Sequence, residues 1–281
     1  MLFRSRYAPK IEVLPDRPGI SMNATKHRIR FDIKTLDALW LLGFNGWRSI
    51  ETYAPAVVLS SLTFTSLEDA LHHDEDIGLF EMDYKSRTQL ASAIIAASDT
   101  SDILWPSDVP IPQSNRDAFS NNQDKVAFDL VCLATAYVLL HEIRHVMFIN
   151  EGTAPSDRRE EEIACDVWAR CFLTDKLAAY ATAANQEYTA LLEKRSMAMA
   201  LGALILYEIT PEHFRWGTKE YPPIAYLMQA IVVGNALTKD SHYWLFAACL
   251  LVGIFRQTHR SLSIVTSSNK ELAEWLISEL L

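Results

Sequence analysis

VCLATAYVLLHEIRH, residues 131–145, is the stretch that most constrains the fold. Its first ten residues are nearly all apolar, which predicts a buried helix running from about Asp124 to Phe148. Asn122 or Asp124 is the expected N-cap, because Asn and Asp side chains accept hydrogen bonds from the first free N–H groups of a helix. On such a helix His141 and His145 lie on one face, since they are four residues apart.

This histidine pair favours a metal site over ordinary core packing. Two imidazoles one helical turn apart can bind a single tetrahedral zinc ion. Glu142 lies next to the first histidine, where it can reach a water molecule on the metal without being a ligand itself. We therefore predict His141 and His145 as zinc ligands and Glu142 as the catalytic general base.

A third ligand is expected from EEEIACDVWARCFL, residues 160–173. A turn at residues 151–155 precedes this stretch, and Ser156 is the expected N-cap of a helix reaching about Tyr180. Two helices joined by so short a turn lie antiparallel, which returns Glu162 to the histidines as the third ligand. Glu160 and Glu161 are interpreted as a solvated acidic first turn.

Two further residues share the helical face of Glu162. Asp166, one turn later, is predicted to accept the second ring N–H of a zinc histidine and so fix its orientation. Cys165 is interpreted as a small packed residue. The alternative is that its thiolate occupies the open zinc position and holds the enzyme inactive.

The rest of the chain predicts a mainly α protein, with a zincin-like helical core and at most a small β element in the N-terminal part. Residues 1–27 are expected to be irregular because of Pro9, Pro15 and Pro18, and His27–Ile33 alternates like one strand. A helical pattern covers residues 36–62, with expected interruptions at residues 43–46 and at Pro55. Two helices are expected within residues 66–98. One further helix is expected in each of the ranges 185–209, 224–237, 241–257 and 269–281.

Three segments are predicted within one compact unit. They are an N-terminal helical lobe of residues 1–120, a zincin core of residues 121–210, and a C-terminal helical lobe of residues 211–281. The first ends in a Pro-rich linker over residues 101–122.

Composition excludes some functions. The net charge of −9 argues against nucleic acid as a partner, because phosphate binding needs a concentrated basic surface. The four cysteines form no Cys-x-x-Cys pair, which favours a reducing compartment. The N-terminal residues contain no apolar core run like that of a secretory signal. We therefore expect a cytoplasmic protein.

The longest apolar runs are Val131–Leu140, Met197–Ile209 and Tyr243–Phe255. Each is shorter than the ~18 to 20 residues that cross a bilayer, so we expect buried core helices and no transmembrane segment. Attachment to a membrane surface stays open as an alternative.

HEIRH followed by EEEIACDVWARCFL resembles the gluzincin metallopeptidases, whose signature is HExxH plus Glu-x-x-x-Asp. More narrowly, the chain resembles the Lit-type phage-exclusion peptidases. The shared features are GFNGWRSIETY at residues 43–53, the apolar run into HEIRH, and a late Pro-Pro segment. This resemblance implies a zinc endopeptidase that cleaves an intracellular host protein, such as a translation factor, to abort phage growth. It also suggests a phage-derived or partner polypeptide as the activator.

The late segment departs from the related pattern. Related gluzincins often carry Thr-His-Pro-Pro and an Arg there, whereas residues 218–227 of this chain are TKEYPPIAYL. A tetrahedral oxyanion needs a second donor besides zinc. The candidates from this part of the chain, for transition-state or substrate contacts, are His213, Tyr221 and Tyr226.

Two other functions are considered. An ImmA-like regulatory protease, which cuts a repressor, uses the same ligand set, but this chain has no helix-turn-helix candidate. A non-catalytic helical binding protein with structural zinc is less favoured. Structural zinc sites are closed and usually rich in cysteine, whereas this pattern supplies three ligands with a glutamate beside them.

Overall fold

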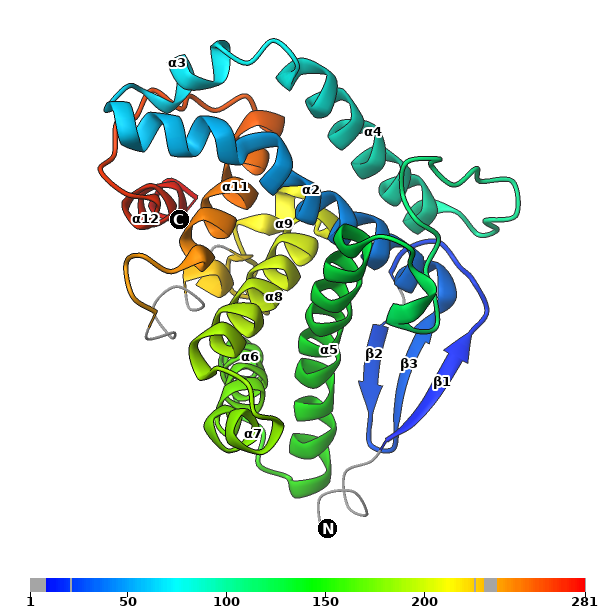
Figure 1. Ribbon diagram of the computed structural model, residues 1–281. Helices are drawn as coiled ribbons and strands as arrows, with labels where there is room; N and C mark the ends of the chain where they lie inside the picture. Colours follow the sequence, from blue (N-terminus) through cyan, green and yellow to red (C-terminus); the bar gives the residue numbers. More distant parts are fainter. Residues whose placement is uncertain (1–8, 21, 225, 230–236, 281) are drawn as a thin grey trace.

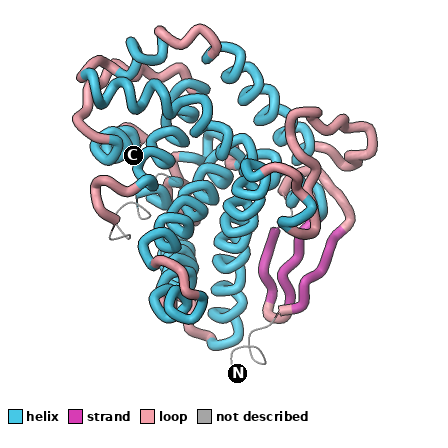
Figure 2. Tube along the Cα trace, in the orientation of Figure 1, coloured by secondary structure: helices cyan, strands magenta, loops and turns pink. Residues whose placement is uncertain are grey.

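The computed structural model describes residues 9–20, 22–224, 226–229 and 237–280. Helices make up most of it, and a three-stranded sheet lies beside them at the N-terminal end (Figures 1 and 2). The prediction of a mainly α fold with a small N-terminal β element is therefore confirmed.

The sheet consists of β1 (Lys10–Leu14), β2 (Met22–Thr25) and β3 (Arg28–Asp32) in the order β1-β3-β2. β1 is parallel to β3, and β2 is antiparallel to it. β3 confirms the strand predicted near residue 30, but the expectation of an irregular start was wrong for β1 and β2. Pro9, Pro15 and Pro18 all lie outside the strands, where the missing N–H of proline costs no sheet hydrogen bond.

β3 packs on one side of α5 (Asn122–Glu151). Ile29 and Phe31 form a small cluster with Val146, and the partly buried Leu139 and Ile143 pack against it. Residues 139, 143 and 146 share one face of the helix because their spacing follows the helical period. This packing leaves another face of α5 for residues 141 and 145. β2 also contacts α5 and is the sheet strand nearest to it in Figure 1.

α2 (Ile33–Thr63) is one continuous helix, so the expected interruptions at residues 43–46 and Pro55 were wrong. A Cβ on Gly43 would lie 2.7 Å from Val131 of α5, and one on Gly46 would lie 2.5 Å from Leu201 of α8 (Tyr188–Ile209). The glycines therefore permit close helix packing instead of ending the helix. Contacts of α2 with α4, α5, α8 and α11 outweigh the ~3 kcal/mol cost of Pro55 inside a helix.

The two helices expected within residues 66–98 are confirmed. The helix predicted up to Tyr180 instead ends at Thr174, because the chain turns at residues 175–176 and a separate helix, α7, begins at Leu177. That helix buries Leu177 and Ala181. The helix predicted near 224–237 falls mainly on residues outside the described part. The other elements are α3 (Leu67–His72), α4 (Ile77–Ala96), η1 (Arg116–Ala118), α6 (Arg158–Thr174), α7 (Leu177–Ala184), α9 (Glu212–Arg215), α11 (His242–Gln257) and α12 (Asn269–Ser278).

The Pro-rich segment of residues 101–122 is irregular apart from η1, and it is fastened to the helices beneath it. Trp40 of α2 donates its indole N–H to Pro110 O at 2.8 Å. The buried Arg87 of α4 pairs with Asp108. The segment is therefore a packed surface connection.

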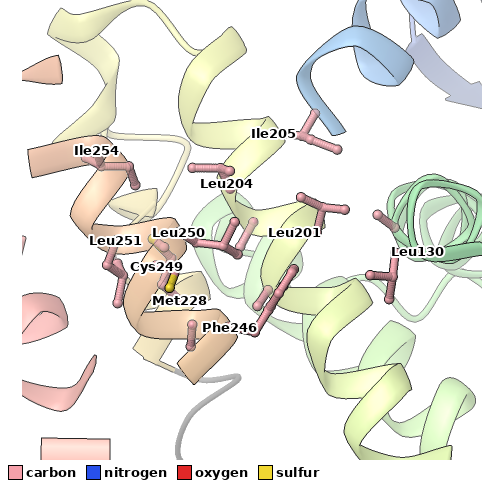
Figure 3. Close-up of a cluster of buried hydrophobic side chains, with 14 of the residues drawn as sticks. Leu130, Leu201, Leu204, Ile205, Met228, Phe246, Cys249, Leu250, Leu251 and Ile254 are labelled. Atoms are coloured by element: carbon pink, nitrogen blue, oxygen red, sulfur yellow. The ribbon is translucent and has the colours of Figure 1, made fainter. Parts of the chain in front are cut away.

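One hydrophobic cluster contains residues from all three segments predicted from the sequence. Figure 3 shows its centre, where Leu201 and Leu204 of α8, Leu250 and Ile254 of α11 and Leu130 of α5 lie together.

Among the described helices, α5 is long and apolar enough to cross a membrane, with a mean hydropathy of 1.7 over an 18-residue window. Apolar residues that flank residues 131–140 lengthen the hydrophobic stretch, but length and composition alone do not contradict the expected core helix. Within this fold α5 contacts α2, α6, α8 and the sheet. Core helices with such packing pass the same length and composition test.

Candidate metal centre

α5 and α6 meet through their polar faces. Gly152, with a φ of 65°, ends α5, and Asp157 caps α6 by accepting a hydrogen bond from the backbone N–H of Arg159. Asn121 caps the N-terminus of α5, one residue before the expected Asn122. Asp157 caps the N-terminus of α6, one residue after the expected Ser156. The helices run antiparallel, as predicted, and bring residues 141–145 against residues 161–166.

Three ligand atoms converge between these helices. Nε2 of His141 lies 3.1 Å from Nε2 of His145 and 3.1 Å from Oε2 of Glu162. Nε2 of His145 lies 3.6 Å from Oε1 of the same carboxylate. Ligands bound at the usual zinc distances in a tetrahedral site are ~3.3 Å apart. These residues therefore fit a zinc ion.

Both histidines hydrogen-bond to a carboxylate through Nδ1. His141 Nδ1 lies 2.7 Å from Asp166 Oδ1, and His145 Nδ1 lies 2.6 Å from Glu161 Oε1. These bonds orient each ring so that its Nε2 faces Glu162. A carboxylate on the other ring nitrogen is typical of metal-binding histidines. Glu161 is only 9% exposed, which corrects its interpretation as a solvated residue, whereas Glu160 is exposed.

The charges of this cluster are strongly coupled. Burial disfavours a charged His141, but hydrogen bonds to Asp166 and Glu162 outweigh it and raise the pKa of His141 to about 10. Burial also opposes ionisation of Glu162, yet its bonds to both histidines lower its pKa to about 2. In the absence of metal, therefore, the positive charge of protonated His141 and the negative charge of ionised Glu162 compensate each other.

Cys165 offers a second donor atom to the histidines. Ligand atoms of His141, His145 and Cys165 lie within 4.8 Å of one another, so this group could hold a metal ion. Its Sγ, however, lies 3.5 Å from Nδ1 of His145, the nitrogen that also bonds Glu161. Burial raises the pKa of the thiol, which disfavours the thiolate that a metal needs. The set containing Glu162 therefore fits the geometry and chemistry of zinc better than the set containing Cys165.

A cleft of about 790 Å³ is lined by two of the three proposed ligands, His141 and Glu162, and by Asp166. Glu142 lies in its wall, and burial raises the pKa of this carboxyl group. Most other lining side chains are apolar and come from β2, α2, α5, the end of α8, α9, and residues 218–224 and 227. They include Met22, Leu39, Val138, Leu206, Ile209, Phe214, Ile224 and Leu227.

The three candidates for substrate contacts differ in their relation to the cleft. Tyr221 lines the cleft, whereas His213 and Tyr226 are not among the described residues that line it. His213 is exposed on α9, with its ring 4.0 Å from that of Phe214. Tyr226 is 53% exposed.

Sequence reasoning missed Arg158, in the first turn of α6. Its guanidinium lies 3.0 Å from Glu161 Oε2 and 2.8 Å from Glu162 Oε1. Residues 158, 161, 162, 165 and 166 follow the i, i+3, i+4 spacing of one helical face, and that periodicity would have identified both Arg158 and Glu161.

The chain matches the model of a known peptidase family. A family described as Peptidase U49 matches residues 29–247, which extends from β3 into α11. Neither the comparison with curated proteins nor the comparison with solved structures gives a match.

Proposed function

Because the chain belongs to the Peptidase U49 family, we propose that it is a zinc-dependent endopeptidase that cleaves an intracellular protein. Family membership implies a peptidase, and hence a polypeptide substrate; it also agrees with the resemblance to Lit-type peptidases. The observation that carries the zinc assignment is the convergence of His141, His145 and Glu162, with a carboxylate behind each histidine.

In this proposal each residue has a distinct task. When bound, zinc supplies Lewis acidity that polarises the scissile carbonyl and lowers the pKa of water. Asp166 and Glu161 keep the Nδ1 protons of the histidines in place, so that both Nε2 atoms remain unprotonated ligands. Glu142 accepts a proton from the attacking water and returns it to the leaving amine. Its raised pKa suits this exchange, because a base closer to neutrality also acts as an acid.

The cleft supports an extended polypeptide as substrate. β2 is an edge strand of the sheet, and Met22 at its start lines the cleft together with Glu142. An extended peptide can add to an edge strand through main-chain hydrogen bonds. The apolar lining would then take its side chains while the general base reaches the scissile bond.

We extend the proposal to phage exclusion in the cytoplasm on the strength of the Lit-type resemblance. A protease acting on an essential host protein has to be restrained, so a phage-derived or partner polypeptide would activate it. Expression without phage should be tolerated, and infection should cause cleavage of a host protein and growth arrest. Strong toxicity in uninfected cells would favour a freestanding toxin instead.

The test of peptidase activity compares newly formed protein termini after expression of wild type, Glu142→Gln and Glu160→Gln, in infected cells. Glu160→Gln is the matched control, because it makes the same chemical change at an exposed position of α6. We expect zinc-dependent new termini with wild type and the control, and none with Glu142→Gln. The same termini at the same rate with Glu142→Gln would refute the proposed mechanism.

A further inference from the structure

Arg158 lies in the first turn of α6, on the helical face that carries the carboxylates of the candidate metal centre. Its guanidinium forms ion pairs with Glu161 Oε2 at 3.0 Å and with Glu162 Oε1 at 2.8 Å. The arginine side chain is 46% exposed, whereas the side chains of the two glutamates are 12% and 8% exposed. A half-exposed cation therefore holds two carboxylates that are nearly buried.

The other oxygen of each carboxylate faces a histidine. Glu161 Oε1 lies 2.6 Å from Nδ1 of His145, and Glu162 Oε2 lies 3.1 Å from Nε2 of His141. Each glutamate is thus held at both oxygens, by Arg158 on one side and by a histidine on the other. The last torsion of a glutamate side chain is otherwise broad, so a carboxylate with a partner on one oxygen alone can turn.

A guanidinium group suits this task because it is planar and presents several N–H donors in a fixed fork. Nη1 of Arg158 faces Glu161 and Nη2 faces Glu162, so one side chain sets the orientation of both carboxylates. An ammonium group on a flexible stem carries the same charge but lacks the fork. The contact with Oε1 of Glu162 also leaves Oε2 as the oxygen directed at His141.

We propose that Arg158 is a positioning residue of the metal centre, because it holds Glu162 with Oε2 toward the metal and Glu161 with Oε1 on His145. The proposal rests on the zinc assignment of the proposed function. An ordinary ion pair between residues three or four apart on an exposed helix only stabilises the helix slightly. The positioning role instead predicts an effect on zinc binding that exceeds any effect on folding.

Arg158→Lys separates orientation from charge. A cation beside a metal site also repels the metal, and lysine keeps that repulsion while it loses the fork. Zinc affinity of the full-length protein, measured by competition with a zinc-binding dye, should fall by roughly 10-fold, the lower end of the usual cost of losing the partner of a metal ligand. Arg159→Lys makes the same chemical change at the exposed neighbouring position and should keep wild-type affinity.

X-ray absorption at the zinc edge provides a readout that a change in helix stability would not move. Wild type and Arg159→Lys should give the same spectrum, in which Glu162 contributes one oxygen. Arg158→Lys should give a different spectrum, because the carboxylate of Glu162 becomes free to turn. Thermal unfolding of the zinc-free proteins should be nearly the same for all three, since a half-exposed ion pair adds little to stability.

Equal zinc affinity and equal spectra for Arg158→Lys and Arg159→Lys would overturn the proposal, as would tighter zinc binding by Arg158→Lys than by wild type. In both cases wild type still binds zinc, so the proposed function stands. Absence of zinc from wild type and both variants would instead refute the metal centre itself, and with it this role of Arg158.

Discussion

The interfaces α5–α6 and α8–α11 bury opposite kinds of side chain. Between α8 and α11 the contacts are apolar and include Leu201, Leu204 and Leu250 (Figure 3). A Cβ on Gly46 of α2 would lie within 3.4 Å of all three leucines. Between α5 and α6 the buried groups include His145, Glu161 and Glu162. Two neighbouring helix pairs of one core therefore use different physical chemistry.

The difference separates stability from function. Burying a leucine contributes roughly 1.5–3 kcal/mol to folding. Burying ionisable groups costs several kcal/mol per ion, and pairing often only balances that cost. The fold alone would be at least as stable with apolar residues between α5 and α6. We infer that the polar α5–α6 interface binds the metal, whereas the apolar α8–α11 interface stabilises the fold.

The largest expected effect comes from breaking the polar interface. His145→Ala removes one of the three convergent atoms, so zinc should fall from about one per chain to none and proteolysis should become undetectable. Far-UV circular dichroism should still show a helical protein, because the apolar core is unchanged. Elemental analysis measures the metal. Full zinc content in this variant would remove His145 from the ligand set.

Breaking the apolar interface should have the reverse outcome. Leu250 is 1% exposed in the centre of the core, so Leu250→Ala should lower the free energy of unfolding by about 2–5 kcal/mol. The folded fraction should keep wild-type zinc content and kcat. Urea unfolding measures the loss of stability. A stable Leu250→Ala protein that lacks zinc would show that the two interfaces are not separable.

Removing the carboxylates behind the histidines should weaken the metal site without abolishing it. Asp166→Ala and Glu161→Ala should each lower zinc affinity by roughly 10- to 100-fold, because a ligand histidine loses the acceptor that fixes its orientation. Glu160→Ala is the matched control on the same helix. Competition with a zinc-binding dye provides the affinities. Equal affinities for Asp166→Ala and the control would mean that its bond to His141 does not support the metal.

Zinc affinity should also depend on pH. Hydrogen bonds to Asp166 and Glu162 raise the pKa of metal-free His141 to about 10, so below that pH zinc must displace a proton from the ring. The protonated state is favoured as pH falls, and zinc affinity should therefore fall by about tenfold per pH unit between pH 8.5 and 6.5. Calorimetry in buffers of different ionisation enthalpy should detect proton release. An affinity that does not change over this range would contradict the coupling.

Local periodicity accounts for the parts of the site that sequence reasoning identified. His141, His145, Glu162 and Asp166 were placed on two helical faces by their spacing alone, and the structure brings their side chains together. Glu161 was misjudged because adjacent glutamates in a first turn look alike in sequence. Which of them is buried depends on the rotation of α6 against α5, a tertiary property.

Non-local packing explains what the sequence did not predict. In the sequence, Gly43 and Gly46 look like a helix break. In the structure they allow α5 and α8 to pack closely against α2. The strand pairing of β1 with β3 is equally non-local, and the prolines around β1 hide it.

The most direct test of the account is the anomalous scattering of crystals grown with zinc, measured on either side of the zinc absorption edge. We predict one peak per chain between α5 and α6, bonded to Nε2 of His141, Nε2 of His145 and a carboxylate oxygen of Glu162. A peak bonded to Cys165 Sγ and Nδ1 of His145, or no peak between these helices, would contradict the proposed metal centre.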